Sequence, residues 1–234
     1  MEKNFSINNN NFDENTEENK VDNIKEIGVP QIPQFPDDIQ FLTIIGEIEG
    51  HIIASPQKKV TKYEHLIPLL VAAVEDPKIK GIFIILNTIG GDVEAGLALA
   101  ELINSIEKPK VSLVLGGGHS IGVPLATSTD YSFIVPTASM TIHPIRTTGL
   151  VIGVPQTFRY FEKMQQRIID FILRTSNIER KELMKLMYAT DEIANDVGTI
   201  LIGHEAVNFG IIDEVGGFSK ALTKLRSLIG NQTK

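Results

Sequence analysis

The chain has 234 residues, a formal net charge of -7 and no cysteine. This length is enough for one sizeable domain, which buries roughly 70% of the surface of its unfolded chain. The acidic balance argues against a nucleic-acid-binding protein, and the lack of cysteine excludes disulfides, thiolate metal sites and thiol nucleophiles.

No apolar run approaches the ~20 residues of a membrane-spanning helix, because glycines or charges interrupt each one. The N-terminus has no basic-then-apolar signal pattern. We therefore expect a cytoplasmic protein with no integral membrane segment.

Residues 1–38 are rich in Asn and Glu and contain Pro30, Pro33 and Pro36 at a spacing of three. Such a segment buries too little apolar surface to offset its chain entropy, so it is predicted to be a disordered tail with a proline-containing hinge. A gate or docking arm is the alternative for this tail. Residues 39–234 are predicted to form one folded domain.

Apolar runs and helical stripes alternate from residue 39 to residue 143. Strands are predicted at 41–48 (with a bulge at Gly46), 81–86, 111–115, 131–135 and 139–143; helices are predicted from Thr61 (capped with Glu64), over 93–106 and from Ser120. Strands that alternate with helices at these intervals predict an α/β fold with a mainly parallel sheet.

After an extended stretch at 146–154, a helix is predicted from Pro155, with Phe158, Phe161, Gln165, Ile168 and Ile172 on one side. Other apolar residues widen its surface, which indicates packing on more than one face. The chain is then predicted to form a helix over 178–188, a helical turn over 204–210, a strand over 211–213 and a final helix over 218–229.

Glycine-containing loops follow two of the strands, at Gly90-Gly91 and at 116–118. Ligands of open α/β sheets bind outside the carboxyl ends of the strands, so both loops lie where a site is expected. Ser120 follows the second loop, where it is a candidate nucleophile or a serine that caps its own helix.

A serine hydroxyl needs a positioned base, most often histidine, which contributes about 10²–10⁴-fold. His143, at the end of its strand, is the candidate base; a structural histidine is the alternative. Main-chain N–H groups aimed at a developing oxyanion contribute a further ~10²–10³ each. The N–H groups of Gly91 and Ile121 are the candidates for that role.

Four segments together resemble motifs of the Clp protease proteolytic subunit (ClpP) family. They are residues 87–96 (Asn-Thr-Ile-Gly-Gly-Asp-Val-Glu-Ala-Gly), 118–122 (Gly-His-Ser-Ile-Gly), 140–144 (Met-Thr-Ile-His-Pro) and 205–213 (Glu-Ala-Val-Asn-Phe-Gly-Ile-Ile-Asp). The match runs from about Phe41 to Asp213 in the order of the family. It is similar above all to the translocation-enhancing, TepA-like branch, while the Asn-rich tail and the three glycines before His119 depart from the main branch.

The resemblance implies a ClpP/crotonase-like fold, with a helix that protrudes after the histidine, and the activity of a serine endopeptidase. It implies that Ser120 is the nucleophile and His143 the base, that Gly91 and Ile121 form the oxyanion hole, and that Gly90, Asp92 and Val93 contact the substrate.

The resemblance also implies a homo-oligomer of stacked rings, in which the helix at 155–175 interleaves between rings. Peptides or unfolded proteins are the implied substrates, and a ring-shaped ATPase is a possible partner. No cofactor is expected, and no metal, because the five histidines lack metal-ligand spacing.

The third member of the triad departs from the family pattern. A gapless match places Gly198 where the family has an aspartate. Asp196 fits only if two residues are inserted before Glu205, and it is the predicted third residue; Asp191 is the second choice. If neither aspartate reaches His143, the chain is a weak protease or a scaffold.

Other functions also fit parts of the pattern. Ser120, Asp191 and His204 follow the chain order of an α/β-hydrolase triad, although that reading leaves His143 without a role. A crotonase-type enzyme acting on acyl-coenzyme A shares the fold and would use acidic residues in place of the Ser–His pair. A non-catalytic oligomeric binding protein is the third alternative.

Overall fold

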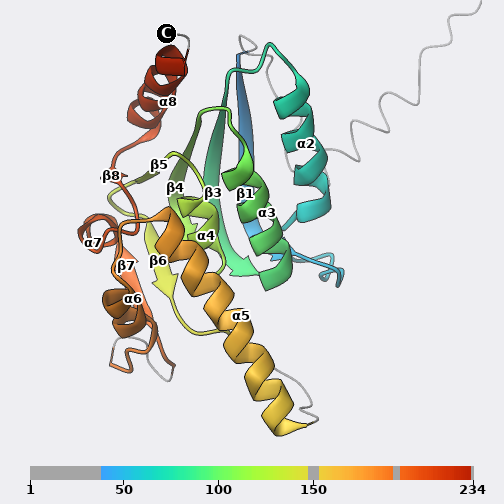
Figure 1. The fold of residues 1–234 in the computed structure, drawn as a ribbon, viewed down its shortest axis with the longest axis vertical. Coiled ribbons are helices and arrows are strands. Elements are labelled where there is room, and N and C mark those ends of the chain that lie inside the picture. The colour runs from blue at the N-terminus through green and yellow to red at the C-terminus, as the bar shows by residue number, and fades with distance from the viewer. Residues whose placement is uncertain (1–37, 147–152, 192–195, 233–234) are drawn as a thin grey trace, which may run out of the picture. The chain divides into compact units, whose positions relative to one another are not determined.

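A mainly parallel sheet organises the computed structural model, which describes residues 38–146, 153–191 and 196–232 (Figure 1). The main sheet has the strand order β2-β1-β3-β4-β5-β8, and all of its neighbouring strands are parallel. Its strands are β1 (Ile39–Glu49), β2 (Val60–Lys62), β3 (Gly81–Gly91), β4 (Lys110–Gly118), β5 (Tyr131–Ile134) and β8 (Glu214–Val215). The predicted α/β class with a mainly parallel sheet is confirmed.

Two further strands lie off this path. β6 (Ser139–Ile142) pairs in parallel with the end of β4 and antiparallel with β7 (Thr199–Ile202). The predicted tail at 1–38 lies outside the described residues except for Asp38, and most of the stretch predicted as extended at 146–154 lies outside them too.

Helices cover both faces of the sheet (Figure 1). They are α2 (Tyr63–Glu75), α3 (Val93–Ser105), α4 (Gly122–Thr127), α5 (Val154–Thr175), α6 (Arg180–Met187), α7 (His204–Asn208) and α8 (Phe218–Gln232). In β3, Ile82 and Ile84 belong to the large core that includes residues of α2 and α3, while Phe83 belongs to a second cluster with Leu225 of α8. Burial on both faces explains the uninterrupted apolar run of this strand.

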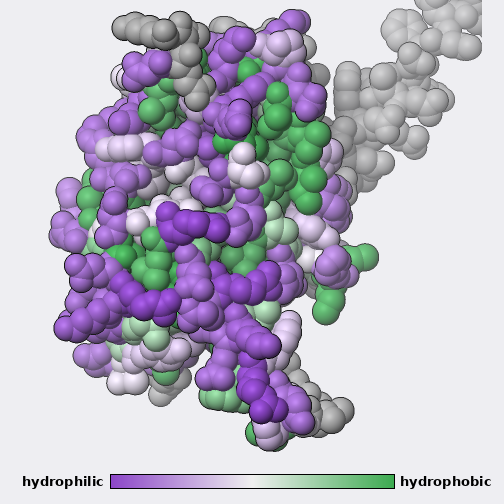
Figure 2. All heavy atoms as spheres, viewed as in Figure 1, coloured by the Kyte–Doolittle hydropathy of each residue, from purple (hydrophilic) through white to green (hydrophobic). Residues whose placement is uncertain are grey.

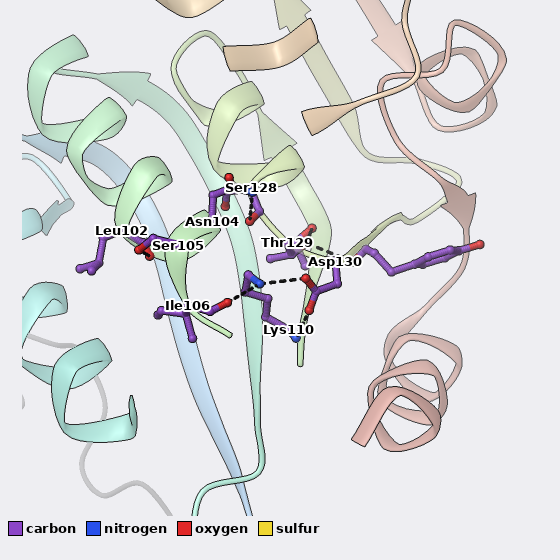
Figure 3. Close-up of polar contacts among 10 residues, drawn as sticks. Leu102, Asn104, Ser105, Ile106, Lys110, Ser128, Thr129 and Asp130 are labelled. Atoms are coloured by element: carbon purple, nitrogen blue, oxygen red, sulfur yellow. Dashed lines mark hydrogen bonds and ion pairs between the residues drawn. The ribbon is translucent and has the colours of Figure 1, made fainter. Parts of the chain in front are cut away.

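The start of β4 is fixed by a buried lysine (Figure 3). The side chain of Lys110 is 4% exposed, and its ammonium donates to the carbonyl oxygen of Ile106 at 2.7 Å and to Asp130 at 2.8 Å. The other carboxylate oxygen of Asp130 accepts the main-chain N–H of Lys110 at 2.8 Å. A buried charge needs such partners, and here they anchor the strand that leads to the turn at Ser120.

Helix α5 is docked by only part of its length, and its N-terminal end projects from the body (Figure 1). Residues 154–163 are exposed or half-buried, and buried positions begin at Met164. Two ion pairs join α5 to α3, one from Arg167 to Glu94 at 2.6 Å and one from Arg174 to Glu101 at 2.7 Å. The helix predicted to protrude after the histidine is therefore confirmed.

Polar side chains explain two of the predictions that are wrong. Thr61 does not start a helix: it lies in β2, where its hydroxyl bonds both the N–H and the carbonyl oxygen of Ile45 at 2.8 Å, and α2 starts at Tyr63 without a side-chain cap. The strand predicted at 211–213 lies at Glu214–Val215 instead. The carboxylate of Asp213 accepts from the N–H and the hydroxyl of Ser132, which holds that segment against β5.

The bulge predicted at Gly46 is confirmed, because the register between β1 and β3 shifts between Gly46 and Glu47. The short strands β2 and β7 are not predicted by the sequence. Within the described ranges, every helix is too short or too polar to cross a membrane.

Candidate active site

Two strand ends, rather than two loops, carry the glycines. β3 continues to Gly91 and β4 continues to Gly118, so both segments are longer than predicted. The side-chain oxygen of Asn87 accepts the N–H of Gly117 at 2.9 Å, and this bond ties the two strand ends together. The segments that lead to Gly91 and to Ser120 are therefore held side by side.

Ser120 occupies a tight turn between β4 and α4 with a left-handed backbone, at φ 57°. The prediction that a helix starts at this residue is wrong, since α4 begins at Gly122. A non-glycine residue in this conformation costs about 1–2 kcal/mol. The surrounding main chain enforces it, because His119 donates to Thr88 at 3.1 Å, Ser120 donates to Thr141 at 2.9 Å, and Val123 donates to Ser120 at 3.0 Å.

One pocket of about 160 Å³ lies at this turn. It brings together four of the predicted site residues, Ser120, His143, Gly91 and Ile121. Its apolar lining comes from helices α3, α4, α5 and α6, from strand β6 and from the segment after β6: Val93, Val123, Ile142, Ile145, Ile168, Ile172 and Met187. The pocket thus places a hydroxyl and an imidazole beside an apolar surface.

Two main-chain N–H groups at this pocket are suited to hold an oxyanion. The carbonyl oxygen of Ile48 in β1 accepts the N–H of Asp92, at 2.9 Å. Gly91 ends β3 and lines the pocket, which makes its main-chain N–H a candidate donor to an oxyanion there. Ile121 precedes the first turn of α4, where N–H groups lack partners inside the helix.

His143 directly follows β6, and its Nδ1 lies 2.6 Å from the carbonyl oxygen of Pro144. Burial lowers the pKa of His143 below its ordinary value of 6.5, and Arg146 lowers it further, whereas the Pro144 hydrogen bond and Asp196 act in the opposite direction. The ring is therefore neutral at pH 7. Among the described side chains, no hydrogen bond joins the hydroxyl of Ser120 to His143, so a proton transfer between them requires a rotation of one or both side chains.

The predicted third residue, Asp196, binds elsewhere. One of its carboxylate oxygens pairs with Arg146 at 2.7 Å, and the other accepts the N–H of Val197 at 2.7 Å. Gly198 lies directly against His143: a Cβ built on it would meet the Cβ of His143 at 2.8 Å, and its φ is +132°. Only glycine fits this conformation and this space, so no side chain can orient the histidine from position 198.

The three residues expected to contact the substrate lie in different surroundings. Val93 lines the pocket. Gly90 packs against the turn at Ser120, where an added Cβ would lie 2.7 Å from the Cβ of Ser120. Asp92 caps α3 by accepting the N–H of Ala95 at 2.8 Å.

The rival α/β-hydrolase arrangement gains no support from this geometry. Asp191 and His204 are exposed, and neither lines the pocket that holds Ser120. Nor, in the described ranges, do three or more histidine, aspartate and glutamate side chains gather as they would around a metal ion.

Sequence reasoning missed two polar side chains that support the site. Nδ1 of His119 bonds the hydroxyl of Thr141 at 2.8 Å, which links the turn at Ser120 to β6. Burial lowers the pKa of His119, and the charge of His143 acts in the same direction. The other is Gln165, whose side-chain oxygen accepts the N–H of Ile145 at 2.7 Å. The sequence feature that could have identified Gln165 is its position, as a polar residue, on the apolar side of α5.

Comparison with known proteins places these features in a family. The family model described as Clp protease matches residues 38–218. The translocation-enhancing protein TepA of Halalkalibacterium halodurans is 53% identical over 213 residues, which make up 91% of this chain and 83% of that protein.

More distant relatives also match. An ATP-dependent Clp protease proteolytic subunit of Streptococcus pneumoniae is 31% identical over 146 residues, 58% of this chain and 68% of that one. The corresponding subunit of Streptococcus sanguinis is 30% identical over 142 residues, with the same two shares.

Proposed function

This chain belongs to the Clp protease family, and on that premise we propose that it is a serine endopeptidase that cleaves peptides or unfolded proteins. Ser120 is the nucleophile and His143 the general base, and the N–H groups of Gly91 and Ile121 hold the oxyanion. The observation that carries the proposal is that all four residues line one pocket.

The proposed reaction has two steps. The oxygen of Ser120 bonds to the peptide carbonyl carbon while Nε2 of His143 takes the hydroxyl proton. The C–N bond then breaks, and His143 passes the proton to the leaving amine. In the second step a water molecule attacks the ester, its proton moves through His143 to the serine oxygen, and the acid product leaves. The N–H groups of Gly91 and Ile121 stabilise the negative oxygen in both steps. Hydrolysis by this subunit itself needs no ATP.

The lining of the pocket supports a preference for an apolar residue next to the cleaved bond. Ile142, Ile168, Ile172 and Met187 supply an apolar wall around a volume of about 160 Å³. An aliphatic side chain buried there gains about 25 cal/mol per Å² of apolar surface removed from water. We therefore propose that a peptide with leucine or methionine at this position is cleaved faster than one with aspartate.

Two apolar surfaces support the proposal that the chain works as a homo-oligomer. The projecting end of α5 exposes Val154 and Phe158, and α2 exposes Leu69, Val71 and Val74. Figure 2 shows the apolar side chains gathered over α2. Contiguous apolar patches of this kind mark interaction sites. Second copies of the chain are the proposed occupants, in stacked rings that enclose the pockets.

A non-catalytic scaffold is the second candidate function. It is favoured by one observation: the carboxylate of Asp196 pairs with Arg146, and no carboxylate among the described residues bonds His143.

Labelling with a fluorophosphonate, which reacts with activated serines, separates the two functions. We expect the wild-type chain to be labelled, Ser120→Ala to be unlabelled, and His143→Ala to react about 10²–10⁴-fold more slowly. His204→Ala, which alters an exposed residue outside the pocket, is the control and should react like the wild type. Labelling that survives Ser120→Ala would remove this serine as the nucleophile, and an unlabelled wild type would favour the scaffold.

A further inference from the structure

The peptide group between Pro144 and Ile145 makes a hydrogen bond at each of its two ends. Its carbonyl oxygen lies 2.6 Å from Nδ1 of His143, and its N–H donates to the side-chain oxygen of Gln165 at 2.7 Å. A carbonyl oxygen can only accept, so Nδ1 of the neutral ring carries the proton. Nε2 is then the nitrogen with a free lone pair, as a base requires.

Gln165 is well placed to hold this peptide group in one orientation. It is 8% exposed and lies in the part of α5 that packs on the body. Its amide nitrogen donates to the sulfur of Met187 at 2.9 Å. Because the N–H of Ile145 needs an acceptor, the oxygen of the Gln165 amide must face it. A buried amide bonded at both ends has little freedom to turn.

Within residues 38–146, 153–191 and 196–232, the Pro144 carbonyl is the one hydrogen-bond partner of Nδ1 of His143. The carboxylate of Asp196 is bonded to Arg146 and to the N–H of Val197. Gly198 lies against the histidine and has no side chain to offer. Two charged groups affect the pKa of His143: Arg146 in its own segment and Asp196 before β7. His119, which follows β4, also interacts with His143, since the charge of His143 lowers the pKa of His119.

We propose that Gln165 is a positioning residue for His143 and acts through the Pro144–Ile145 peptide group. The hydrogen bonds run from the imidazole to the carbonyl, and from the N–H of the same peptide group to the Gln165 amide. This neutral relay takes the place of a carboxylate in orienting the base. The inference rests on the proposed function, in which His143 is that base.

A neutral relay has a chemical consequence that separates it from a carboxylate. It fixes the tautomer and the angle of the ring, but it adds no negative charge to stabilise the imidazolium formed during the reaction. The base is therefore a weak one, and the lowered pKa of His143 agrees with this.

The test uses two substitutions at one position and a matched control. Gln165→Met keeps the length of the side chain but removes the acceptor for Ile145, whereas Gln165→Glu keeps an acceptor and removes the donor to Met187. Gln166→Met makes the same change at the next residue of α5, which is exposed. Fluorophosphonate labelling is measured against probe concentration and pH, and the ring nitrogens of His143 are observed by NMR, with His143→Ala to assign them.

We expect Gln165→Met to lower the maximal labelling rate by roughly 10²-fold, the cost of a displacement of about 1 Å in a catalytic group. The probe concentration at half-maximal rate should not change, because Gln165 does not line the pocket. The pH midpoint should fall, since the Pro144 bond raises the pKa of His143. Gln165→Glu should keep most of the rate, and Gln166→Met should match the wild type.

Three results would overturn the inference. One is wild-type labelling and unchanged His143 nitrogen signals in Gln165→Met. Another is a larger loss of rate in Asp196→Asn than in Gln165→Met, which would identify a carboxylate as the orienting group. The third is a neutral His143 ring in the wild type that carries its proton on Nε2. This result decides the question even if Gln165→Met fails to fold. If the wild type is not labelled at all, the proposed function fails, and the NMR signals still decide whether the relay exists.

Discussion

The left-handed backbone of Ser120 predicts an unusual order of stability between two variants. Both Ser120→Ala and Ser120→Gly remove the hydroxyl, but only alanine keeps a Cβ in a conformation with φ 57°. Alanine there costs about 1–2 kcal/mol relative to glycine. Glycine loses more chain entropy on folding, which costs it about 0.5–1 kcal/mol. The glycine variant should therefore be more stable than the alanine variant by about 0.5–1 kcal/mol.

Urea unfolding of the two variants at equal protein concentration measures this difference. In thermal unfolding, the midpoint temperature of the glycine variant should be about 1–4 °C higher than that of the alanine variant. At most ordered positions the order is the reverse, since glycine destabilises helices and strands. Val123→Gly, in the short helix that follows the turn, supplies that comparison and should be less stable than Val123→Ala. If Ser120→Ala is the more stable variant at position 120, the three main-chain hydrogen bonds named above do not hold Ser120 in a strained conformation.

Two further predictions concern buried charges and histidines. Asp130→Ala removes the carboxylate that bonds both the ammonium and the N–H of Lys110. This variant should therefore lower the free energy of unfolding by about 1.5–3 kcal/mol, measured by urea unfolding. An unchanged urea midpoint would contradict this. Because burial lowers the pKa of His119 and of His143 below 6.5, the unfolded chain binds more protons than the folded chain just below that pH. Stability should therefore fall as the pH drops below 6.5 and be fully present above it, and a urea midpoint equal at pH 7 and pH 5.5 would refute the assignment.

The apolar patterns predicted the main elements well because burial in the core dictates them locally. The run at 81–86 is apolar at every position after the glycine, and it forms a strand covered on both faces. The stripe from Pro155 became α5. The errors at Thr61 and at residues 211–213 occurred where a polar side chain bonds a residue far away in the sequence. Thr61 bonds Ile45, which is 16 residues away, instead of capping a helix. A local pattern cannot foresee such a partner.

The candidate site also contains residues that local motifs predicted and one residue whose role depends on a long-range contact. Ser120, His143, Gly91 and Ile121 were predicted from their motifs, and they meet at one pocket. The role of Gln165 was not predicted, because it depends on a contact with Ile145 across 20 residues. Asp196 stays a prediction as the third residue. Its pairing with Arg146 could not be read from spacing, since it depends on where two separate segments lie.

The sequence by itself determined the alternation of strands and helices, the family motifs and the identity of the chemically capable side chains. These depend on residue type and on period along the chain. Only the tertiary structure decided the left-handed turn at Ser120, the partner of each polar group and the direction in which His143 faces. Those features arise where strands β4 and β6 and helix α5 pack together, and the hydrogen bonds across that packing select one conformation among several that the local sequence allows.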